Sequence, residues 1–453
     1  MKVRRAALMA ILLAVLCSCR SVPNASPDAS TEVTKTASVQ SRQTTADALG
    51  LSEATVEATL MHGPWPVRFR PDPGNRASGH PAAIELGRRL FNDPRLSADG
   101  QRACVNCHRP EQGFADGRAR SPAAHGGPLD RNAQGLLDVR LQHWFGWDGA
   151  ADSLWAFVMR PLADTQEMGA STESLEQLFA RDAQLACLRQ AAFELPDPAA
   201  RTSSPRPQSV RVEIAKSLAA YLETLDSPRS RFDDFRDALD RGDIEAARRY
   251  PADAMRGLEL FTGAGRCNLC HLGPAFSNGE FHDIGRPHFA ANARPDPGRH
   301  GGIKAVLSDP YNRLGVWSDA DSTRQPVGSA SDTAVLTRHL QAHHRNFGEF
   351  RVPGLRGALH TAPYFHDGSA PDLAAVVNHY SDIDLERLHA DGESVLRPLK
   401  LDARARADLL AFLETLSQAS PVQAGRAPWA GRNEPIHSQA CAMARSAPSS
   451  TPP

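Results

Sequence analysis

Apolar residues recur at helical spacing in several segments of the chain, most clearly between residues 210 and 225. There Val212, Ala215, Leu218 and Leu222 fall on one side of a helix, the pattern of a helix buried on one face. Strand-like alternation is scarce, and Pro and Gly interrupt the long connections. The pattern predicts a mainly α-helical protein with long irregular connections.

The chain repeats itself once over most of its length. One copy opens with GRRLF at 87–91 and the other with GLELF at 257–261, and a Cys-x-x-Cys-His motif follows in each. The copies close with similar helix-like segments, LAAYLETL at 218–225 and LLAFLETL at 409–416. The repeat predicts two small helical domains in tandem, over residues 61–250 and 251–420.

A second pair of motifs supports the same alignment of the two copies. Trp-Asp-Gly at 147–149, followed by Leu154, corresponds to His-Asp-Gly at 366–368, followed by Leu373, at identical spacing. The second copy also carries an insertion of roughly Phe289 to Arg345.

Cys-x-x-Cys-His is the attachment signature of c-type haem: two thiols form thioethers, and the adjacent His is the proximal iron ligand. A pair of zinc sites is the alternative, because zinc also binds Cys and His. Two copies at the same place in a repeat favour two covalent haems, each wrapped in one cytochrome c-like domain. The attachment residues are then Cys104, Cys107 and His108 for the first haem, and Cys267, Cys270 and His271 for the second.

The repeat also compares what lies on the other face of each iron. Pro161 stands in the first copy where Tyr380 stands in the second. Proline offers no side-chain ligand, so the first iron can remain open to a small oxidant. Tyr380 is either a ligand of the second iron or one more half-buried aromatic residue. Catalase provides a precedent for tyrosine ligation of haem iron.

Methionine is an improbable ligand of the second haem. After His271 the only methionine is Met443, near the C-terminus. The remaining candidates are Tyr311, Tyr364, Tyr380 and several histidines, including His282, His343, His344, His360, His366 and His379.

Glu167 is a candidate acid–base residue shortly after Pro161. Cleavage of a peroxide O–O bond requires a group that takes one proton and delivers it to the leaving oxygen, and a carboxylate can do both. The alternative is a surface glutamate, which is the usual location of this residue type.

The N-terminus predicts export. A charged start and a short apolar run over 1–19 are typical of a signal peptide, and the run ends in a sequence similar to a bacterial lipoprotein box. Either the signal is simply cleaved, or Cys19 is acylated and anchors the protein to a membrane. Residues 20–60 are predicted to form a flexible tether and 421–453 a disordered tail.

The net charge of the chain gives no indication of nucleic-acid binding. The net charge of the 453-residue chain is −1, so no global basic field favours nucleic acid.

Of the eight cysteines, Cys187 and Cys441 belong to neither the signal nor the motifs. In an oxidising compartment they can pair, or both can remain thiols.

Several of these motifs together resemble the bacterial dihaem cytochrome c peroxidase family, including its MauG branch. The similarity extends over roughly residues 80–418. It is carried by the segment 85–117, by Trp-Asp-Gly at 147–149, by Glu-Met-Gly at 167–169, by FHDIG at 281–285 and by VPGLRGALHTAPYFHDG at 352–368.

The resemblance implies roles for individual residues. Glu167 would be the acid–base residue at a peroxide-reactive first haem, and Trp147 would carry electrons between the haems. Tyr380 would be the distal ligand of the second haem, as in the MauG branch. The resemblance further implies one calcium ion bound by Asn132, Thr361 and Pro363. His125 is either a removable ligand of the first haem or a loop residue beside a Gly pair.

These observations predict a periplasmic oxidoreductase that uses hydrogen peroxide and an unidentified electron donor, either a protein or a small molecule. One alternative is a non-catalytic electron carrier in which both irons are six-coordinate. Another is an enzyme of the MauG type that oxidises side chains of a partner protein.

Overall fold

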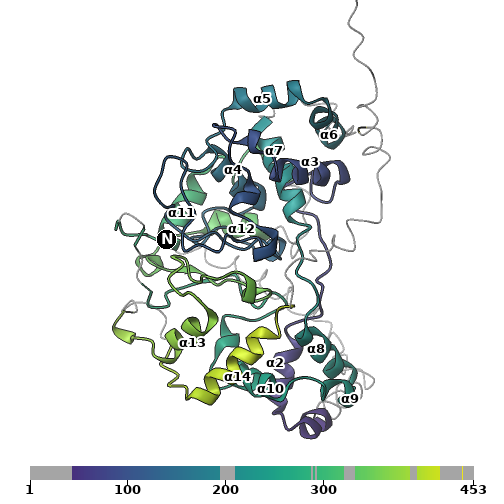
Figure 1. Ribbon diagram of the computed structural model, residues 1–453, viewed down its shortest axis with the longest axis vertical. Helices are drawn as coiled ribbons and strands as arrows, with labels where there is room; N and C mark the ends of the chain where they lie inside the picture. Colours follow the sequence, from purple (N-terminus) through teal and green to yellow (C-terminus); the bar gives the residue numbers. More distant parts are fainter. Residues whose placement is uncertain are drawn as a thin grey trace, which may run out of the picture.

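The computed structural model describes residues 43–193, 210–286, 289–290, 293–320, 332–387, 395–418 and residue 441. These residues are mainly helical, as the sequence predicts, and the helices form an upper and a lower group (Figure 1). The helices are α2 (Glu53–Leu60), α3 (Pro81–Phe91), α4 (Leu154–Ala163), α5 (Thr172–Arg181), α6 (Ala183–Phe193), α7 (Val210–Leu222), α8 (Arg231–Arg241), α9 (Ile244–Ala247), α10 (Ala252–Thr262), α11 (Arg299–Ser308), α12 (Asp332–His339), α13 (Leu373–Ser381) and α14 (Ala403–Glu414). A two-stranded antiparallel sheet joins β1 (Phe281–His282) to β2 (Phe350–Arg351).

Each group has its own apolar core. In the upper group, α3, α4, α5, α6 and α7 bury one cluster. In the lower group, α2, α8, α10 and α14 bury the other. Burial of these faces is the main favourable term that holds each group together.

The repeat in sequence is a repeat in structure. In each copy the opening glycine permits close crossing of the first and last helices. A Cβ on Gly87 would lie 2.0 Å from the Ser217 carbonyl oxygen of α7. A Cβ on Gly257 would lie 2.0 Å from the Asp408 carbonyl oxygen of α14. Any larger residue would therefore force the two helices apart.

The middle of each copy also matches. Phe145 and Ala151 form an isolated antiparallel β-bridge before α4, and Tyr364 and Ala370 form the corresponding bridge before α13. Both helices then begin with a side-chain cap, Ser153 for α4 and Asp372 for α13. Pro161 of α4 and Tyr380 of α13 therefore occupy equivalent positions.

Membership of the two cores does not follow chain order. The insertion within the second copy packs on the first group, where Lys216 of α7 donates to Asp319 and the Tyr311 ring contacts that of Trp155 at 6.4 Å. Conversely, the segment before α3 packs on the second group, where His62 stacks on Phe276 at 4.2 Å.

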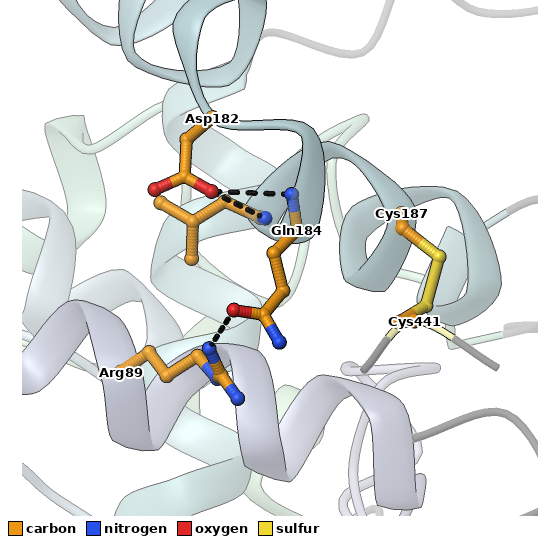
Figure 2. The surroundings of a disulfide bond; sticks show 6 residues. Arg89, Asp182, Gln184, Cys187 and Cys441 are labelled. Atoms are coloured by element: carbon orange, nitrogen blue, oxygen red, sulfur yellow. Dashed lines mark hydrogen bonds between the residues drawn. A yellow bond between two sulfur atoms is a disulfide. The ribbon is translucent and has the colours of Figure 1, made fainter. Parts of the chain in front are cut away.

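The predicted tether and tail lie partly outside the described residues. Within the part of 20–60 that is described, α2 is helical and buries Thr55, Val56 and Thr59, so a flexible tether does not extend to residue 60. In the predicted tail, the described residue Cys441 is only 2% exposed and forms a disulfide with Cys187 of α6 (Figure 2). The pairing that the sequence left open is thus formed, and it ties residue 441 to the first core.

Candidate functional site

The first Cys-x-x-Cys-His motif forms a short 3₁₀ turn, Cys104–Asn106, that places its histidine against a backbone carbonyl. The Nδ1 of His108 donates to the Phe114 oxygen at 2.9 Å. Phe114 adopts a left-handed φ of 62° that non-glycine residues rarely take. This bond engages Nδ1, so Nε2 is the ring nitrogen that can bind a metal.

The second motif repeats the arrangement. Its turn is Cys267–Leu269, and the Nδ1 of His271 donates to the Phe276 oxygen at 3.0 Å. Phe276 also has a positive φ, of 54°. The same backbone conformation thus holds both imidazoles through Nδ1.

The chemistry of both motifs fits covalently attached haem. All four motif cysteines are free thiols. Burial lowers the pKa of His108 and of His271, which favours the neutral imidazole that binds metals. Within the described ranges, no group of three or more His, Cys, Asp or Glu side chains is placed to hold a metal ion.

A cavity of about 970 Å³ lies beside the second motif, at the upper end of the range for ligand pockets. Cys267, Cys270, His271 and Tyr380 line it, together with Trp147 from the first copy. Burial raises the pKa of the Tyr380 phenol, with smaller contributions from the two neighbouring cysteines. The structure thus brings Tyr380 and the second motif into one site.

Glu167 lies near the first motif, in the turn that follows α4. Burial and the nearby Asp164 raise the pKa of its carboxyl to about 7, against the effect of Arg160. Its charge in turn contributes to raising the thiol pKa of Cys104 and of Cys107, after the larger effect of burial. Glu167 is therefore a half-buried group that can exchange protons near neutral pH, unlike an ordinary surface glutamate.

Trp147 is held by contacts from both copies. Its indole Nε1 donates to the Asn132 oxygen at 2.9 Å, and its carbonyl accepts from the backbone N–H of Arg351 at 2.8 Å. The neighbouring Asp148 pairs with Arg131 at 2.7 Å, and Arg131 also pairs with Asp296 at 2.7 Å. These contacts fix the indole in the wall between the two groups.

Asn132, Thr361 and Pro363, the predicted calcium ligands, are also among the residues that line the cavity. The Asn132 amide nitrogen donates to the Arg118 oxygen at 2.8 Å, and its backbone nitrogen donates to the His366 oxygen at 2.8 Å.

His125 is exposed in a turn that contains Gly126 and Gly127, both with positive φ. The adjacent Ala124 donates to the Gln166 oxygen at 2.7 Å, which places this turn beside the Glu167 segment.

Sequence reasoning missed two buried arginines in the cavity wall, Arg299 and Arg351. No local pattern marks them, because arginine is usually exposed and its burial depends on distant segments.

Comparison with known proteins gives the family. Residues 81–240 match the di-haem cytochrome c peroxidase family. The methylamine utilization protein MauG of Methylorubrum extorquens is 33% identical over 336 residues, which cover 74% of this chain and 78% of that protein. The chain belongs to the di-haem cytochrome c peroxidase family. Cytochrome c551 peroxidase of Nitrosomonas europaea is 27% identical, over 74% of this chain and 80% of that protein.

Solved structures share the fold of this chain. A MauG-like protein associated with microbial copper homeostasis superposes with a TM-score of 0.56 and 25% identity, over 81% of this chain and 99% of that chain. The di-haem peroxidase BthA of Burkholderia thailandensis shares the fold, with a TM-score of 0.52, 24% identity and coverage of 80% of this chain and 91% of that chain.

Family membership confirms the predicted enzyme class. The protein is a di-haem oxidoreductase of the cytochrome c peroxidase type, and its family implies two haems. None of the described helices of this di-haem peroxidase is long and apolar enough to cross a membrane.

Proposed function

We propose that this di-haem peroxidase reduces hydrogen peroxide at its first haem and uses the second haem to share or relay the electrons. In the overall reaction, one peroxide takes up two electrons and two protons and yields two water molecules. The electrons come from a protein or small-molecule donor. The observation that carries this proposal is the contrast between α4, which presents Pro161, and α13, which presents Tyr380 at the equivalent position.

Each haem would be held by one cytochrome c-like unit of the tandem pair. His108 and His271 would ligate the irons through Nε2, because Nδ1 of each is already bonded to a carbonyl. The haem supplies the redox centre, and the protein supplies ligation, orientation and proton transfer.

Glu167 would act as the acid–base residue. With a pKa of about 7 it is deprotonated in an appreciable fraction of molecules at neutral pH. It can accept the first peroxide proton and return it to the leaving oxygen. A carboxyl with an ordinary pKa would hold that returned proton much less readily.

Tyr380 would be the distal ligand of the second haem. An isolated phenolate is unfavourable in this buried position, so the ligand role requires the positive charge of ferric iron to compensate it. An anionic oxygen ligand in turn stabilises ferric iron, which suits a haem that shares oxidising equivalents.

Calcium and export complete the proposal. Asn132, Thr361 and Pro363, which all line the cavity, would supply oxygen ligands to one calcium ion. The enzyme would act in the periplasm, either free or anchored at Cys19. The Cys187–Cys441 disulfide supports an oxidising compartment.

The spin states of the two haems test the proposal directly. The purified ferric protein should show one high-spin haem, open to peroxide, and one low-spin haem with six ligands. Added peroxide should change the high-spin signal first. Electron paramagnetic resonance with stopped-flow absorbance measures both properties. Two low-spin haems unmoved by peroxide would instead indicate the non-catalytic electron carrier.

Replacing Trp147 with Phe should slow electron sharing between the haems by about tenfold or more, because the indole lies between the two groups and phenylalanine is much harder to oxidise. That rate can be followed by flash reduction and absorbance. Trp317→Phe is a matched control, since Trp317 packs against Tyr311, with ring centroids 6.4 Å apart, and is not among the residues that line the cavity. Equal rates in wild type and Trp147→Phe would remove Trp147 from the path.

A further inference from the structure

Two arginines in the cavity wall are buried without a carboxylate partner. Arg299 and Arg351 are each 4% exposed, and among the described residues neither forms an ion pair. The guanidinium of Arg351 donates to the Gly146 and Val352 oxygens, both at 3.3 Å. Arg299 donates to the Gly149 oxygen at 2.8 Å.

Other buried arginines of this region are paired. Arg356 makes two bonds to Asp233, at 2.8 and 2.9 Å. Arg131 is held between two aspartates. Burying a charge carries a large desolvation penalty that a carboxylate partner offsets. In the described part of the chain, Arg299 has only carbonyl oxygens and the rings of Trp144 and Phe281 as partners, so the lack of a carboxylate at both arginines is the exception that needs an explanation.

The pKa values of both guanidinium groups are consistent with the lack of a paired carboxylate. Burial lowers the pKa of Arg351 to about 10, and no carboxylate offsets this effect. Burial lowers the pKa of Arg299 to about 10 as well, although Asp148, Glu280 and Glu349 offset part of it. These carboxylates do not reach pairing distance, and Asp148 is already bound to Arg131.

The two arginines lie at one place in the cavity. Both donate to carbonyl oxygens of the 146–149 loop, which carries Trp147. His366 contributes a third buried polar group to the same cavity. It is 3% exposed and stacks on Phe350 at 3.6 Å, and its Nε2 has no hydrogen-bond partner.

A c-type haem carries the negative charges that the buried arginines of this cavity wall lack as partners. Thioether bonds hold its vinyl edge at the Cys-x-x-Cys-His motif, and two propionate carboxylates leave the opposite edge. Buried carboxylates require cationic partners, and arginine binds them with strong charge-assisted hydrogen bonds.

We propose that Arg351 and Arg299 bind the propionates of the second haem, with His366 as an additional donor, and that their charge sets the reduction potential of that haem. The inference rests on the proposed function, since it places the second haem in this cavity. A nearby cation stabilises the reduced haem, which carries one more electron, and so raises the potential.

The midpoint potential of each haem tests the proposal. In Arg351→Met the reduction equilibrium of the second haem should shift at least tenfold toward the oxidised form, which is a fall of about 59 mV for a one-electron couple. The first haem should be unchanged. Arg351→Lys should keep the wild-type potential, because it retains the charge. Spectroelectrochemistry without peroxide measures both haems, and a pyridine haemochrome assay counts them.

Arg345→Met is the matched control, because Arg345 lines the same cavity but is exposed to solvent. In this variant the midpoint potential of the second haem should remain close to that of wild type. If Arg351→Met does not fold, Arg299→Met provides the same test. Equal potentials in the Met and Lys variants, with both haems bound, would overturn the proposal, and so would an equal shift in Arg345→Met. Wild-type protein with no second haem would refute the proposed function instead.

Discussion

Replacing Glu167 with Gln should slow the reaction with hydrogen peroxide by about 10²–10⁴-fold, the usual contribution of a general acid–base group. The amide is close in size to the carboxyl, so the turn after α4 and both haems should remain in place. It cannot take up the peroxide proton, however, and this is the step that precedes O–O cleavage. Stopped-flow absorbance under pseudo-first-order peroxide gives the rate constant.

The pH dependence provides an independent check on the same residue. The pKa of Glu167 is raised to about 7, and the proton acceptor is the deprotonated form. The wild-type rate should therefore fall as the pH drops through 7, whereas the Glu167→Gln rate should be nearly flat. Glu173→Gln at the exposed start of α5 is the matched control and should react like wild type. A wild-type rate in Glu167→Gln would exclude Glu167 from the mechanism.

Replacing Tyr380 with Phe should raise the potential of the second haem by an amount of the order of hundreds of millivolts. Axial ligand identity moves haem potentials over about 0.8 V, and loss of an anionic oxygen ligand removes the preference for ferric iron. The low-spin signal of the ferric second haem should change at the same time. Redox titration and electron paramagnetic resonance measure the two effects, and the phenyl ring preserves the packing of α13.

Tyr364→Phe is the matched control for this experiment. Tyr364 lines the same cavity, but its hydroxyl donates to the Ala358 oxygen at 2.8 Å. Its loss should leave both the potential and the spin state of the second haem unchanged. If Tyr380→Phe also left them unchanged, Tyr380 would be a packing residue and the sixth ligand would have to come from one of the cavity histidines.

The local sequence was sufficient to predict haem attachment and to reveal the repeat. The spacing of Cys104, Cys107 and His108 predicts attachment without reference to the rest of the fold, because all three groups lie within one turn of chain. The crossing glycines, Gly87 and Gly257, mark the same helix contact in both copies. Helical periodicity then predicted a mainly helical protein, and the matching motifs predicted the family, both of which are confirmed.

Only the tertiary structure decided which segments share a core. The insertion of the second copy packs on the first group through Tyr311 and Asp319. Hydrophobic periodicity cannot reveal such contacts, because it describes one element at a time.

The environment of single side chains was likewise decided only by the tertiary structure. Glu167 lies in a polar segment typical of a surface turn, and its raised pKa comes from burial by the folded chain. Arg299 and Arg351 are likewise ordinary arginines in the sequence, and their lack of a carboxylate partner exists only in the assembled cavity.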